Sequence, residues 1–142
     1  MPKLLLFAPC EKLLIDEQTK TISLIVILQE IHYKIPPGTQ IQPGAMLPMQ
    51  WSIVTLWREE EPQDSHVEFE QQLLIEGSGG DILSTNEARF KFTAPSHRMI
   101  AHVPGIPLGS RKINVRLAYR VAGVKDWIPL ASYPIELMQD VI

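Results

Sequence analysis

The feature that recurs along the chain is an alternation of apolar and polar residues with a period of two. It is clearest over His66–Glu76 and Lys112–Val121, and a shorter run over Arg89–Phe92 repeats it. Neighbouring side chains on a β-strand point to opposite faces, so these segments are predicted strands with one buried side. The residues on the predicted buried side of the two longer segments are Val67, Phe69, Leu73, Ile75, Ile113, Val115, Leu117, Tyr119 and Val121.

Two further segments, Thr21–Ile31 and Met49–Trp57, are apolar on both faces. They are dominated by β-branched and aromatic residues, which favour strands over helices. We therefore predict that both are central strands, each covered on its two sides. The remaining predicted strands are Lys3–Phe7, Arg98–Val103 and Trp127–Met138.

Turn signals separate the predicted strands, since most of the 12 prolines fall between apolar runs. The predicted loops are Asp16–Thr19, Lys34–Leu47, Glu59–Asp64, Gly77–Asn86 and Pro104–Ser110, with a hairpin turn at Ala122–Lys125. About eight strands without an amphipathic helix are typical of two packed sheets. In a chain of 142 residues, this pattern predicts one all-β domain over residues 1–142, a two-layer antiparallel β-sandwich.

The strand assignments also predict which side chains meet between the two sheets. Large apolar residues on the inward face of each strand should form the core, because their burial supplies most of the driving force for folding. The predicted core residues are Ile22, Leu24, Val26, Ile53, Phe69, Leu73, Phe90, Ile113, Val115, Leu117 and Tyr119.

Several short motifs have a recognisable order. At the start they are Cys10-Glu11, Asp16, Thr21 and Ser23–Leu28, and at the end they are Pro107–Gly109, Ile113–Val121 and Ala131–Leu137. In this order the chain resembles an uncharacterised family of small bacterial immunoglobulin-like or C2-like sandwich domains. The resemblance implies an immunoglobulin-like or C2-like topology and a bacterial source, and it carries over no catalytic residue.

Charge and cysteine content narrow the expected partners and compartment. The formal net charge of −3 is too small to indicate binding to nucleic acid or to an anionic membrane surface. The single cysteine, Cys10, allows no internal disulfide, which favours a reducing, cytoplasmic compartment. The sequence contains no apolar stretch of transmembrane length, so a membrane is not an expected partner.

Residues with catalytic or metal-binding chemistry do not combine into a site. His97 and His102 are five residues apart, which puts them on opposite faces of a regular strand and argues against a shared metal ion. Glu59–Asp64 is better explained as a solvated turn than as a calcium loop. Gly77–Gly80 lacks the lysine of a phosphate-binding loop. We predict no catalytic residue, no cofactor and no metal, and therefore a protein that is not an enzyme.

The function predicted by exclusion is a non-catalytic protein-interaction or assembly module whose partner is another protein. The alternative is a domain that binds a small ligand, a sugar or a lipid, through loops at one end. All three tryptophans lie in or beside predicted strands rather than in loops, which weakens the sugar alternative. An enzyme of unrecognised type is the third hypothesis.

A partner is expected at the end of the sandwich that carries the longest loops. If consecutive strands alternate in direction and Arg89–Val103 counts as one bent strand, Lys34–Leu47, Gly77–Asn86 and the turn near Gly123 share one end, opposite Glu59–Asp64 and Pro104–Ser110. Lys34–Leu47 carries more apolar side chains than a solvated loop needs, and its prolines lower the entropy lost on docking. The predicted partner-binding residues are Ile35, Ile41, Gln42, Met46 and Asp81. The alternative is that this loop packs against its own sandwich.

Overall fold

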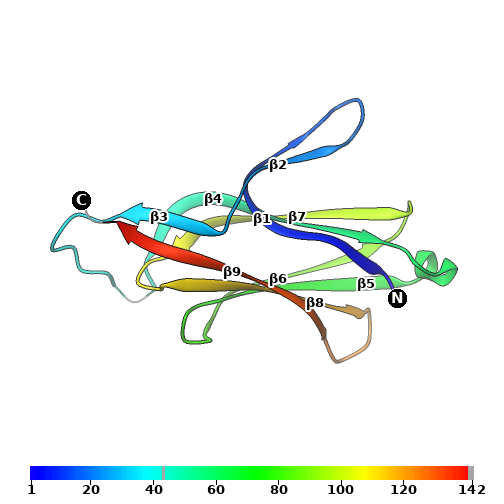
Figure 1. The fold of residues 1–142 in the computed structure, drawn as a ribbon. Helices are drawn as coiled ribbons and strands as arrows, with labels where there is room; N and C mark the ends of the chain where they lie inside the picture. The colour runs from blue at the N-terminus through cyan, green and yellow to red at the C-terminus, as the bar shows by residue number, and fades with distance from the viewer. Residues whose placement is uncertain (43, 141–142) are drawn as a thin grey trace.

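The computed structural model describes residues 1–42 and 44–140, and its strands form two packed sheets. Figure 1 shows the strands in chain order. They are β1 (Lys3–Ile15), β2 (Ile22–Ile27), β3 (Glu30–Lys34), β4 (Met46–Arg58), β5 (Glu68–Glu76), β6 (Ile82–Lys91), β7 (Ser96–Pro107), β8 (Lys112–Val121) and β9 (Ile128–Asp140). A short 3₁₀ helix, η1 (Pro62–His66), precedes β5.

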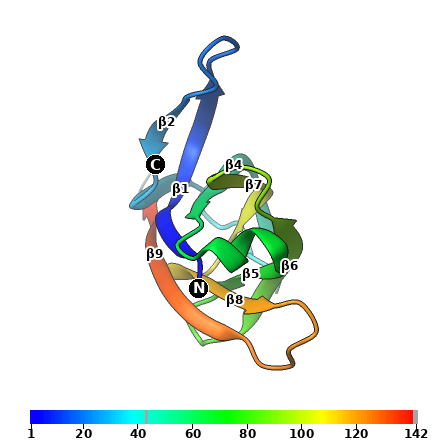
Figure 2. The same ribbon diagram turned by 90° about the vertical axis from the view of Figure 1, so that its right-hand side faces the viewer.

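The two sheets differ in size and in strand direction. The four-stranded sheet has the order β2-β1-β4-β7 and is antiparallel throughout. The five-stranded sheet has the order β3-β9-β8-β5-β6, is mixed because β3 runs parallel to β9, and curls into a half-barrel (Figure 2). The prediction of an all-β chain in two layers is confirmed. The structure describes nine strands where about eight were predicted, and the predictions of purely antiparallel sheets and of a plain immunoglobulin-like or C2-like sandwich are wrong.

The largest departure from the sequence prediction lies in Thr21–Ile31, which is not one central strand. It divides into β2 and β3, which belong to different sheets. Between them the amide of Leu28 donates to the carbonyl of Pro9, and Leu28 is buried. Apolarity on both faces predicted two-sided burial, but β2 is an edge strand. The predicted core residues Ile22 and Leu24 are only half-buried, and Val26 is 55% exposed.

The other predicted core residues are confirmed, because all of them are buried between the sheets. They are Ile53, Phe69, Leu73, Phe90, Ile113, Val115, Leu117 and Tyr119. Trp57 stacks on Phe90, with ring centroids 5.4 Å apart. A polar contact also joins the layers, since Gln71 Oε1 on β5 accepts hydrogen bonds from Thr55 Oγ1 (2.7 Å) and Trp57 Nε1 (2.8 Å) on β4.

Three predicted loops are partly strand, and one of them, Lys34–Leu47, contains the end of β3 and the start of β4. β6 begins at Ile82, inside the predicted loop Gly77–Asn86, and β7 runs to Pro107, inside the predicted loop Pro104–Ser110. The first half of β6 is exposed and carries serine, threonine and asparagine, so it lacks the apolar alternation of a half-buried strand. Its strand conformation comes from backbone pairing with β5.

The predicted grouping of loops at the two ends is wrong in part. The carbonyl of Glu68 accepts from the Ala122 amide, so the Gly123 turn lies at the end that also holds η1 (Figure 1). Pro107 and Leu108 share a cleft with Met46 and Asp81 at the opposite end. The prediction treated Arg89–Val103 as one bent strand, whereas β6 and β7 belong to different sheets. The chain reverses direction between β6 and β7, and a single bent strand omits this reversal. Every predicted loop after β6 was therefore assigned to the wrong end.

Charged residues on the outer face of the five-stranded sheet pair across strands. Glu70 contacts Arg89 (3.7 Å) and Arg120 (3.3 Å), and Arg116 Nη1 donates to Glu76 Oε1 (2.8 Å). The arginine and glutamate charges therefore neutralise each other within the domain. The Arg116–Glu76 pair, whose arginine is half-exposed, adds little to stability.

This arrangement predicts a contrast between neighbouring residues on β8. Arg116→Ala should lower the free energy of unfolding by less than about 1 kcal/mol, because the Arg116 side chain is half-exposed and solvent screens its ion pair. Val115→Ala should lower it by about 2 kcal/mol, since Val115 is fully buried. Urea denaturation measures both values. Equal effects would mean that the two faces of β8 are wrongly assigned.

Candidate functional site

A hairpin stands away from the two packed sheets (Figures 1 and 2). It consists of the second half of β1 and of β2, residues 11–27, hereafter the arm. The two strands pair from Lys12 opposite Ile25 to Ile15 opposite Ile22. The turn is closed by Asp16, whose Oδ1 accepts the backbone amides of Gln18 and Thr19. This is the local bonding that makes aspartate favourable at a turn.

The arm is unusually apolar for an exposed element. Leu14 is 57% exposed, and four further aliphatic side chains on the arm are also exposed, namely Ile15, Ile25, Val26 and Ile27. Single exposed aliphatic residues are ordinary on protein surfaces, but five of them on one short hairpin are more than an exposed element needs. The arm is therefore the first candidate for a contact with another molecule.

The edge of β2 lacks the devices by which proteins protect free strand edges. Charged side chains and prolines normally discourage pairing with another chain. Among the four edge strands in the described part of the chain, β2 alone has neither a charged residue nor a proline. The other edges carry Glu30, His32 and Lys34 on β3, Glu87, Arg89 and Lys91 on β6, and Arg98 and Pro104 on β7.

The arm leaves the body of the protein at a strained position. β1 pairs with β4 as far as Cys10, and the arm begins at the next residue. On the other strand, Val26 lies between the paired residues Ile25 and Ile27 with a φ of 56°. A β-branched residue rarely adopts this left-handed conformation, and such strain is concentrated at functional sites.

Val26→Gly is expected to leave the free energy of unfolding unchanged or to raise it by about 1 kcal/mol. Glycine removes the left-handed penalty of about 1–2 kcal/mol, which offsets its own entropic cost. Val121→Gly is the matched control, because Val121 is a similarly exposed valine on β8 without a positive φ. That variant should lose about 1 kcal/mol in chemical denaturation. A Val26→Gly loss as large as the control's would argue against strain at the base of the arm.

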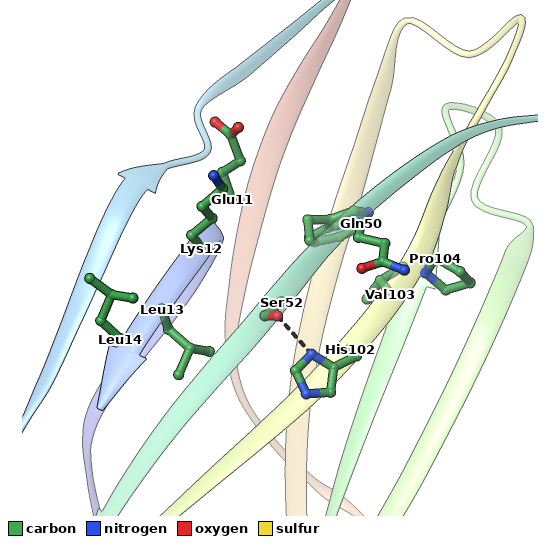
Figure 3. A pocket seen from close by; sticks show the side chains of 10 residues that line it. Glu11, Lys12, Leu13, Leu14, Gln50, Ser52, His102, Val103 and Pro104 are labelled. Carbon is green, nitrogen blue, oxygen red and sulfur yellow. Dashed lines mark hydrogen bonds between the residues drawn. The ribbon is translucent and has the colours of Figure 1, made fainter. Parts of the chain in front are cut away.

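A groove of about 630 Å³ lies between the arm and the outer side of β4 and β7 (Figure 3). Leu13 lies on the side of the arm that faces β4, and Leu14 on the other side. Across the groove, Ser52 Oγ is hydrogen-bonded to His102 Nδ1 at 3.0 Å. Arg98 on β7 donates to the carbonyl of Lys20 in the turn (3.0 Å), which tethers the arm over the sheet.

Comparison with protein-family models and with curated proteins gave no match. The resemblance to small bacterial domains therefore stays a prediction.

The Ser52–His102 pair does not form a nucleophile–base–acid arrangement. In the described residues the His102 ring has one side-chain hydrogen bond, that to Ser52, and Ser52 itself is buried. A catalytic serine needs an accessible hydroxyl and a base oriented by a third group. Cys10 is also fully buried, and burial raises the pKa of its thiol, which disfavours the reactive thiolate.

His97 and His102 lie on opposite sides of β7, as their spacing predicts. His97 stacks on Phe90 in the core, with ring centroids 5.2 Å apart, whereas His102 faces the groove. Within residues 1–42 and 44–140, no group of three histidine, cysteine, aspartate or glutamate side chains is placed to hold a metal ion. The same residues include no helix long and apolar enough to span a membrane.

The structure brings together only two of the predicted partner-binding residues. Met46 and Asp81 line a cleft of about 500 Å³ at one end of the domain. Ile35 packs against the core, Ile41 lies beside Gly109, and Gln42 is exposed. Pro43, one of the prolines expected to stiffen the loop, lies outside the described residues.

The positions of Ile35 and Ile41 favour the alternative in which the loop packs against its own sandwich. The cleft beside Met46 and Asp81 has the size of a ligand pocket, so a small-ligand site there stays a prediction.

The arm was not predicted from the sequence. The available signal was the turn Asp16–Thr19 between two apolar runs, which is typical of a hairpin.

Proposed function

We propose that this domain is a non-catalytic protein-interaction module that joins another chain by adding a strand to the free edge of β2. The observation that carries the proposal is the composition of that edge. Within the described residues, β2 has no strand partner on one side, and it carries no charge, no proline and several exposed aliphatic side chains. Strand addition uses such an edge, with backbone hydrogen bonds for affinity and alternate side chains for selectivity.

The arm also gains from a third strand. A two-stranded hairpin is marginally stable in water, and three or more strands with an apolar face are needed for independent stability. The arm is joined to the body by the chain itself, through β1 and β3. Among the described residues, one side-chain hydrogen bond also holds it, from Arg98 to the carbonyl of Lys20. An added strand would complete the hydrogen bonding of β2 and cover aliphatic side chains such as Ile25 and Ile27.

Ile25→Lys should release the protein from its native complexes. A lysine in the middle of β2 places a charge where another strand would pair, and the side chain is already partly exposed, so folding should be retained. The tagged chain is expressed in its native cells, and the mass of its complexes is measured by native mass spectrometry. The wild-type protein should be found in complexes heavier than the free tagged chain, whose mass is 16.1 kDa plus that of the tag. The Ile25→Lys variant should have the mass of the free tagged chain.

Val124→Lys is the matched control, because Val124 is an exposed aliphatic residue in the turn between β8 and β9, away from the arm. Its complexes should keep the wild-type mass. A wild type that runs at the mass of the free chain, or equal masses for Ile25→Lys and wild type, would refute the proposed function.

A further inference from the structure

We propose that a cleft on the outer face of the five-stranded sheet binds a neutral carbohydrate, with a sugar ring seated against Trp127. The cleft has a volume of about 410 Å³ and lies over β5, β8 and β9. That volume is in the range of small-molecule sites. Because β2 belongs to the other sheet, this inference is independent of the strand addition proposed above.

The cleft is hollow because a small residue lies among larger ones. Ala118 on β8 is paired with Gln72 on β5 and with Pro129 on β9, and all three line the cleft. Arg116, two residues earlier on the same face of β8, lines it as well. The methyl group of Ala118 therefore forms the floor, and the longer side chains stand around it.

Trp127 supplies a flat aromatic wall. The sequence predicts this residue in a strand, but β9 begins at Ile128, and the half-buried Trp127 lies in the connection after β8 (Figure 2). The guanidinium carbon of Arg120 lies over the indole, 3.9 Å from the ring centroid. Arg120 is itself held by Glu70 (3.3 Å) and by the carbonyl of Lys125 (2.9 Å). This cation–π contact orients the ring before a ligand arrives, which lowers the cost of binding.

An aromatic wall with hydrogen-bonding groups around it suits a sugar. The face of an aromatic ring carries negative potential, which attracts the C–H groups on the face of a sugar ring. Arg120 is not a lining residue, so the ring surface that meets the cleft is not the one that Arg120 covers. Arg116 has N–H groups beyond the one bonded to Glu76, and the Ser132 hydroxyl can donate and accept. These groups match the hydroxyls at the edge of a sugar, which also donate and accept.

The charges beside the cleft favour a neutral ligand. Arg116 is paired with Glu76, and Arg120 with Glu70, so both arginine charges are already balanced. A phosphate or carboxylate ligand would compete with these glutamates and would be repelled by them. A neutral polyhydroxyl ring can accept from the remaining N–H groups without displacing either glutamate.

The three tryptophans give the test an internal control. The ¹⁵N-labelled wild type is titrated by NMR with cellobiose, maltose, lactose and mannobiose, each to about 20 mM, which detects dissociation constants of about 1 mM. At least one of these sugars should shift the indole N–H signal of Trp127. Trp51 and Trp57 are buried. Their indole N–H groups donate to Gly105 and Gln71, so their signals should stay in place.

Two alanine substitutions locate the binding. Ala118→Met fills the floor of the cleft at an outward-facing position, so the fold should be retained while the affinity for the sugar falls about 10-fold or more. Ala94→Met is the matched control, because Ala94 is exposed in the turn between β6 and β7, and its affinity should stay within about 2-fold of the wild type. Ile25→Lys should also bind the sugar normally, which separates this inference from the function proposed for β2.

Three results would overturn the inference. The first is that none of the sugars shifts the Trp127 signal, and the second is that Ala118→Met binds the sugar as tightly as the wild type. The third is a shift with adenosine or with glucuronate and none with the neutral sugars, which would assign the cleft to a planar aromatic or to an anionic ligand. Each of these results would leave the strand addition at β2 untouched.

Discussion

Gln71→Ala should lower the free energy of unfolding by about 4 kcal/mol, a large share of the stability of a domain this size. Gln71 is 2% exposed, and its amide oxygen is the acceptor for Thr55 and for Trp57 on the opposite sheet. Truncation leaves two buried donors without partners, each costing about 1–3 kcal/mol, and adds a cavity. The two sheets lose the polar contact that joins them.

The control for this prediction is the next residue on the same strand. Gln72 faces outward, and its Nε2 donates to Glu87 Oε1 at the surface (3.1 Å). Gln72→Ala should cost less than about 0.5 kcal/mol, because water replaces that partner. Urea or guanidinium denaturation of both variants is the measurement. Similar losses would mean that the Gln71 contacts to Thr55 and Trp57 do not stabilise the fold.

Phe90→Ala should be comparably destabilising, at about 4 kcal/mol. The Phe90 ring is buried at the centre of an aromatic cluster, with ring centroids 5.6 Å from Phe69 and 5.4 Å from Trp57. Removing it deletes these contacts and leaves a cavity that the rigid neighbours fill poorly. Arg89→Ala, at the adjacent exposed position, is the control and should cost less than about 1 kcal/mol.

A second readout makes this prediction specific, because Phe90 covers His97. Burial lowers the pKa of His97 below its usual value of 6.5. The unfolded chain therefore binds a proton on His97 before the folded chain does, so this residue makes stability fall as pH drops below about 6.5. Phe90→Ala should raise the His97 pKa, measured by NMR titration, and weaken that pH dependence. An unchanged pKa would show that Phe90 does not cover the ring.

The strands that could be predicted from the sequence are those with one buried and one wet face. β5 and β8 have this environment, so their alternation follows directly from burial. β6 could not be placed at its start, since an exposed edge strand has no apolar side to reveal it. The parallel pairing of β3 with β9 depends on the break after β2, which no local pattern indicates.

The arm illustrates why the candidate site was harder to predict than the fold. Ile22–Ile27 is apolar on both faces, and a strand buried on both sides has the same sequence pattern. Only the tertiary arrangement shows that the second half of β2, Ile25–Ile27, stays exposed. Lys34–Leu47 and Gly77–Asn86 were correctly expected at the same end, where Met46 and Asp81 line one cleft. Whether they bind a partner is still a prediction.

Amide hydrogen exchange along β2 tests the central claim, that another chain pairs with the free edge of this strand. Exchange is compared between the isolated chain, diluted to a monomer, and the native complex. In the complex, the β2 amides that do not pair with β1 should become protected, while the free edge of β6 exchanges equally in both samples. Unchanged exchange along β2, with new protection along β6 or β7, would contradict the account and move the interface to the opposite edges of the two sheets.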